Sequence, residues 1–72
     1  MSTLDAQLLT AHAAGDKAAL VALYRQAGDA AVSQDEAAFF LTNAYIYALE
    51  IGHADADTLR ARLVAMGREQ EA

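Results

Sequence analysis

The sequence has no cysteine, no proline and no tryptophan. Without cysteine there can be no disulfide framework, the usual support of very small secreted domains. Without proline, helix ends must be set by glycine and by capping side chains. No segment alternates apolar and polar residues as a half-buried strand would, and alanine is abundant. These features predict an all-α fold.

Basic residues are scarce. Five Lys and Arg stand against ten Asp and Glu, which gives a net charge of −5 at pH 7 and a pI near 4.6. Nucleic-acid backbones and anionic membrane surfaces are bound by clusters of Lys and Arg, so we expect neither as a partner. The first residues, 1–5, lack the basic region and apolar run of a signal peptide. A cytoplasmic protein is the expectation.

The chain is also short. A domain of 72 residues buries only about 60% of the surface that its unfolded chain exposes, so its stability margin is thin. Stability must therefore come from helix packing or from association. We expect residues 1–67 to form one helical domain and residues 68–72 to be a frayed tail.

Glycine punctuates the helix-like apolar pattern at Gly15, Gly28, Gly52 and Gly67. Glycine just beyond a helix end adopts the left-handed conformation at little cost. Residues that cap free amides precede the helical segments, and Ser33 with Glu36 forms a capping box. We predict four helices with N-caps at Ser2, Asp16, Ser33 and Asp55, broken near Gly15, in the loop Gly28–Val32 and near Gly52–Ala54.

The connections at Gly15 and Gly52 are very short. Short connections between helices favour antiparallel neighbours, so we expect two stacked antiparallel α-hairpins. The two turn glycines lie 37 residues apart, a spacing typical of helical-hairpin repeats.

The first hairpin resembles a tetratricopeptide repeat. It carries Gly15-Asp16 at the turn, followed by Leu20, Tyr24 and Ala27 in the pattern of that family's second helix. The second hairpin has Leu41, Ala44, Ala48 and Gly52 at acceptable positions, but Asp57 and Ala61 replace the family's alanine and large aromatic, and no proline closes either hairpin. The resemblance implies a module that binds peptides or proteins and has no chemistry of its own.

Two groups of residues are candidates for chemistry. His53, Asp55 and Asp57 could hold a divalent cation, but calcium and zinc sites need more ligands than these. Asp55 as a helix cap and Asp57 beside a helix N-terminus explain the same residues. His12 could act as a general base, but no nucleophile or orienting partner accompanies it. We expect no catalytic residue, no metal and no cofactor.

The segment from Ala37 to Leu49 has only two polar side chains, Thr42 and Asn43. Wound as a helix at about 100° per residue, it places Phe39 and Ile46 in an otherwise polar stripe. The expected core face is Phe40, Leu41, Ala44, Ala48 and Ile51, with Tyr45 and Leu49 on one flank and Tyr47 on the other.

Two explanations remain open for Phe39 and Ile46. Either another part of the chain folds over them, or they are apolar anchors of an interface with a polar surround. The second explanation predicts a protein–protein interaction module that binds a partner protein or another copy of itself. An obligate accessory subunit of a larger enzyme or complex is the alternative. The predicted partner-binding residues are Phe39, Thr42, Asn43, Ile46, Tyr47 and Glu50.

Overall fold

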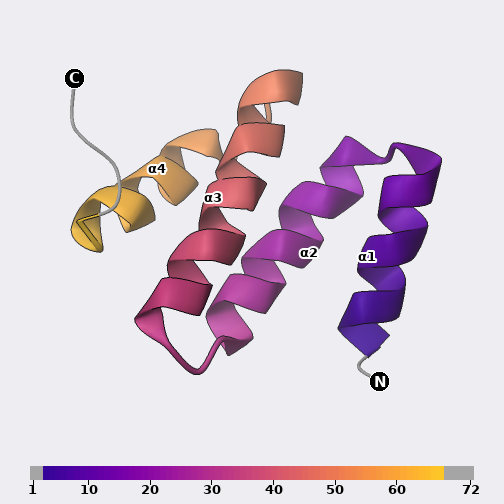
Figure 1. Cartoon of the computed structure of the whole chain (residues 1–72). Helices are drawn as coiled ribbons and strands as arrows, with labels where there is room; N and C mark the ends of the chain where they lie inside the picture. The colour runs from indigo at the N-terminus through magenta and orange to yellow at the C-terminus, as the bar shows by residue number, and fades with distance from the viewer. Residues whose placement is uncertain (1–2, 68–72) are drawn as a thin grey trace.

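The computed structural model describes residues 3–67, and this part of the chain is helical without any strand. Consecutive helices run in roughly opposite directions (Figure 1). The predicted all-α fold of four helices is confirmed. The predicted Ser2 cap and the tail 68–72 lie outside the described residues. The helices are α1 (Thr3–Ala14), α2 (Lys17–Ala30), α3 (Gln34–Ile51) and α4 (Ala56–Ala65).

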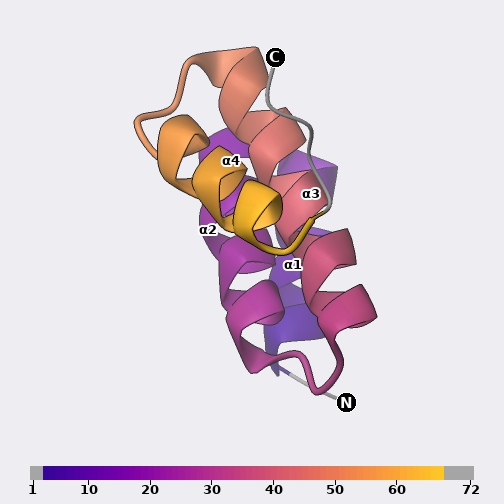
Figure 2. The ribbon, with the colours of Figure 1, turned by 90° about the vertical axis from the view of Figure 1, so that its left-hand side faces the viewer.

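The central pair of helices is α2 and α3, which make the most extensive helix–helix contact in the described chain. Helix α1 packs on α2, and α4 packs on α3. Viewed from the side, α4 lies in front of the central pair and α1 lies behind it (Figure 2). The outer helices are thus separated by the central pair, and α3 keeps one face that no other helix covers.

The core joins the central pair to α4. Val21 of α2 is fully buried against α3, whose contribution includes two alanines that allow close helix approach. The predicted core residues Leu41, Ala44 and Ala48 are buried, whereas Ile51 is exposed near the end of α3. The core cluster is Val21, Leu41, Ala44, Ala48, Leu59 and Leu63.

The predicted caps of α2 and α3 are confirmed. The Asp16 carboxylate accepts a hydrogen bond from the Ala19 amide at 3.1 Å, and the Ser33 hydroxyl accepts one from the Glu36 amide at 3.1 Å. Gly52 ends α3 with a φ of +63°, a left-handed conformation that an L side chain rarely adopts. These helix ends are set by local chemistry.

The predicted loop at Gly28–Val32 is wrong at its start. Helix α2 continues through Gly28 to Ala30, and only residues 31–33 connect it to α3. Gly28 is buried inside the helix, where a Cβ atom would lie 2.8 Å from the Leu41 side chain. Its function is therefore to let α2 approach α3, and it does not end the helix.

Candidate functional site

Large apolar side chains are exposed on the outer face of α3. Phe39 is 62% exposed and Ile46 is 50% exposed, as expected from the helix winding. The opposite side of α3 carries the buried residues Leu41, Ala44 and Ala48. No described segment folds over Phe39 or Ile46, so the first of the two explanations for them does not hold within residues 3–67.

Leu49 belongs to the same face, whereas helix winding predicts it on a flank of the core face. It is 56% exposed and lies three residues after Ile46 and seven after Thr42. Residues at these spacings share one face of a helix, and this spacing is the signal by which Leu49 could have been found. We call the following set the exposed α3 face: Phe39, Thr42, Asn43, Ile46, Leu49 and Glu50.

Tyr47 lies elsewhere on α3. It is half-buried and packs against the core cluster. Its ring stacks on that of Tyr24 with centroids 6.0 Å apart, and it lies 6.1 Å from the ring of His12. The structure therefore places Tyr47 toward α1 and α2 and not with the predicted partner-binding residues Phe39 and Ile46.

Two polar residues of the exposed α3 face, Asn43 and Glu50, bond within the chain. Glu50 accepts a hydrogen bond from Lys17 at 3.1 Å, which ties the end of α3 to the start of α2. The Asn43 side-chain amide donates to the Phe39 carbonyl at 2.9 Å. These bonds hold the Asn43 and Glu50 side chains in place beside the apolar residues. Thr42 is exposed and lies between Phe39 and Ile46 in the sequence.

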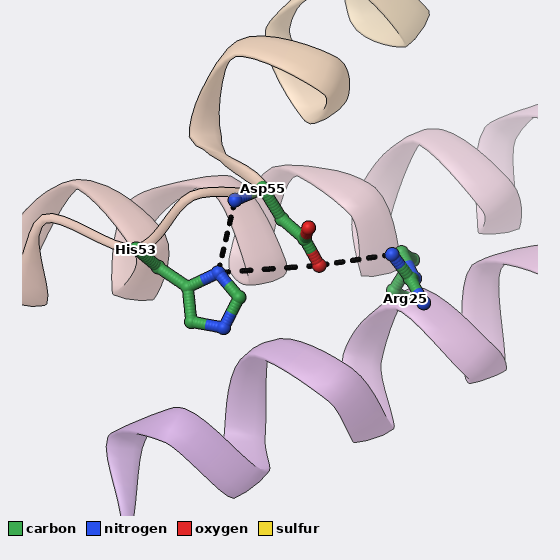
Figure 3. Close-up of polar contacts among 3 residues, drawn as sticks. All are labelled: Arg25, His53 and Asp55. Atoms are coloured by element: carbon green, nitrogen blue, oxygen red, sulfur yellow. Dashed lines mark hydrogen bonds and ion pairs between the residues drawn. The ribbon is translucent and has the colours of Figure 1, made fainter.

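The predicted capping role of Asp55 is wrong. Its carboxylate makes no capping hydrogen bond and instead accepts one from Arg25 of α2 at 2.9 Å (Figure 3). The amide of Asp55 donates to Nδ1 of His53 at 3.0 Å. An arginine from another helix has drawn the carboxylate away from the free amides of α4.

No cluster of three or more His, Cys, Asp or Glu side chains in residues 3–67 is arranged to hold a metal ion. His53 and Asp55 are adjacent, with 3.9 Å between Nδ1 and Oδ2, but Asp55 is also paired with Arg25. A guanidinium beside the carboxylate competes with a cation for the same oxygens.

His12 lies in an aromatic cluster that connects three helices. Its Nε2 atom lies 2.8 Å from the Tyr24 hydroxyl, and its ring meets both Tyr24 and Tyr47 edge-on. Burial raises the pKa of the Tyr24 hydroxyl above its ordinary value, and the neighbouring Tyr47 raises that pKa further. The hydrogen bond and ring contacts of His12 join α1 to α2 and α3.

Comparison with known proteins gives no match to a protein family, to a curated protein or to a solved structure. Within residues 3–67, no helix has both the length and the apolar content needed to cross a membrane.

Proposed function

We propose that this chain is a small protein–protein interaction module that binds a partner protein, or a second copy of itself, through the exposed α3 face. The supporting observation is the exposure of Phe39 and Ile46, which project one heptad apart from a single helix. The tetratricopeptide-like pattern of the first hairpin supports the same class, an adaptor without chemistry of its own.

The binding free energy would come chiefly from these apolar side chains. Fully burying a Phe, Ile or Leu side chain contributes about 1.5–3 kcal/mol, and interface anchors of this kind lie inside a polar rim. The exposed α3 face has this composition, with Asn43 and Glu50 beside the anchors. A partner that covers Phe39, Ile46 and Leu49 therefore gains binding energy without disturbing the core.

The experiment is the double substitution Phe39→Ser and Ile46→Ser. The variant should keep the circular dichroism spectrum and melting temperature of the wild type within a few degrees, because neither side chain belongs to the core cluster. It should lose self-association in analytical ultracentrifugation or lose proteins captured from the native cell. Val32→Ser is the matched control, since Val32 is 94% exposed and lies outside the exposed α3 face.

One result would contradict the proposal directly. If the double variant unfolds while its folded fraction binds as well as the wild type, Phe39 and Ile46 support the fold and the interaction surface lies elsewhere. If wild type and double variant associate equally and both are folded, the exposed α3 face has no part in binding.

A second candidate function is an obligate accessory subunit of a larger enzyme or complex. The observation in its favour is the sparse packing of α1, which packs mainly on α2, buries only Ala11 and leaves Leu9 71% exposed. A purified chain that unfolds without cooperativity, or aggregates, supports the obligate subunit. Cooperative unfolding of an isolated monomer or dimer supports the free module.

A further inference from the structure

We propose that the exposed α3 face binds a single amphipathic helix of a partner protein, one with apolar residues at heptad spacing flanked by Lys or Arg. This inference rests on the proposed function and names the chemistry of the partner. Three observations carry it: the spacing of the exposed residues, the shape of the surface beside Phe39 and the distribution of charge.

The spacing is that of a helix–helix seam. Phe39, Thr42, Ile46 and Leu49 follow one another at intervals of three, four and three residues, which are the a, d, a and d positions of two heptads. All four are exposed. At about 1.5 Å per residue the seam is about 15 Å long, which matches three turns of a second helix.

The surface beside Phe39 has the form of a hole for a side chain. An open depression there is lined by Asp35, Ala38, Phe39, Thr42 and Asn43. The first four stand at i, i+3, i+4 and i+7, the four-residue hole that receives one knob of a facing helix. Ala38 is small and already buried, so it adds no bulk to the surface of this depression.

The charge around the seam is negative. Helix α3 contains Asp35, Glu36 and Glu50 but no Lys or Arg, and of these acids Glu50 is paired with Lys17. Among the basic side chains of the other helices, three pair with acids inside the fold, through Lys17–Glu50, Arg25–Asp55 and Arg62–Asp29. Flanking Lys or Arg on a partner helix would complement this face and speed its association.

A second copy of the chain complements the face less well. In an antiparallel pair, Phe39 of one copy would face Leu49 of the other. Glu36 would then lie beside the Lys17–Glu50 pair at both ends, and α3 has no Lys or Arg to complement it. A parallel pair would place Asp35, a d position in this register, opposite its own equivalent. Like charges across an interface are unfavourable, and the pair would carry twice the net charge of −5. Charge therefore favours a basic helix as the occupant.

The test uses two synthetic three-heptad peptides with leucine at a and d. One carries lysine at e and g, and the other carries glutamate there. Binding of each labelled peptide to the full chain is followed by fluorescence anisotropy at about 0.15 M salt, where surface charges act over about 8 Å. We expect the lysine peptide to bind at least about tenfold more tightly than the glutamate peptide.

Variants locate the site. The double substitution Phe39→Ser and Ile46→Ser should lower the affinity for the lysine peptide by about tenfold or more. Val32→Ser should leave this affinity unchanged. Thr42→Leu should raise the affinity for the lysine peptide severalfold, because leucine at this position completes the apolar seam. If the lysine peptide binds the double variant as tightly as it binds the wild type and Val32→Ser, its binding is non-specific attraction to an acidic protein, and the inference is overturned.

Two further outcomes separate this inference from the proposed function. If neither peptide binds but the chain self-associates through Phe39 and Ile46, the interaction module stands and the basic helix is wrong. If neither peptide binds and the double variant changes no association at all, both proposals fail.

Discussion

Gly28 of α2 packs directly against Leu41 of α3, so closely that a Cβ atom on Gly28 would lie 2.8 Å from two side-chain atoms of Leu41. Leu41 is 1% exposed and belongs to the core cluster, so it has little room to move. This contact lies within the most extensive helix pair of the described chain. The separation of α2 and α3 therefore depends on a residue without a side chain.

Gly28→Ala should destabilise the domain. Alanine normally gains about 0.5–1 kcal/mol over glycine inside a helix, but overpacking a core commonly costs about 1–3 kcal/mol. We expect a net loss of about 1–2 kcal/mol in the free energy of unfolding, measured with urea. The loss caused by Gly28→Ala should be smaller when the substitution is made in a Leu41→Val background, because the smaller valine leaves room for the added Cβ atom. A Gly28→Ala variant more stable than the wild type would show that α2 and α3 are not this close.

The sequence predicted the helix ends that local chemistry sets. Asp16 and Ser33 lie within three residues of the amides they bind, and Gly52 needs only its own backbone conformation. Gly28 and Asp55 could not be assigned in this way. The same glycine can end a helix or allow close packing, and the same aspartate can cap a helix or pair with an arginine. Only contacts with residues far along the chain, Leu41 and Arg25, decide which occurs.

Only part of the exposed α3 face could be predicted from the sequence, because the rest depends on contacts with the other helices. Helix winding correctly gave the exposure of Phe39 and Ile46, because the periodicity of one helix fixes which residues share a face. The winding of α3 alone does not show how far the neighbouring helices extend along it, and therefore does not show which of its residues they cover. Ile51 lies on the expected core side but near the end of α3, where it remains exposed, and Tyr47 meets the aromatic residues of α1 and α2.

Ser33→Ala should lower the stability of the domain by about 1 kcal/mol, because the Glu36 amide loses its acceptor. In a domain of this size such a loss corresponds to a melting temperature lower by about 4–8 °C, which circular dichroism would detect. Gln34→Ala is the control, as an exposed neighbour whose replacement should change stability by less than about 0.5 kcal/mol. Equal melting temperatures for Ser33→Ala and the wild type would mean that the cap does not support α3.

Asp55 offers a test between capping and ion pairing. Asparagine caps helices about as well as aspartate, but it cannot form the charged pair with Arg25. We expect Asp55→Asn and Asp55→Ala to be destabilised alike, each by less than about 1 kcal/mol because the pair is partly exposed. The difference from the wild type should shrink in high salt. If Asp55→Asn matches the wild type while Asp55→Ala does not, Asp55 acts as a cap in solution.

Tyr24 should make stability fall at alkaline pH. Its pKa is raised in the folded chain, chiefly by burial and further by Tyr47, so the unfolded chain loses this proton first as pH rises. The stabilisation is complete below the ordinary pKa near 10 and is lost as pH rises through the pKa of the folded state. We expect the free energy of unfolding, measured in urea between about pH 8 and 11, to decline more steeply for the wild type than for Tyr24→Phe. The variant also lacks the hydrogen bond to His12, which lowers its stability by about 1 kcal/mol near neutral pH. The two curves should therefore converge as pH rises, and parallel curves would show that Tyr24 titrates alike in the folded and unfolded chains.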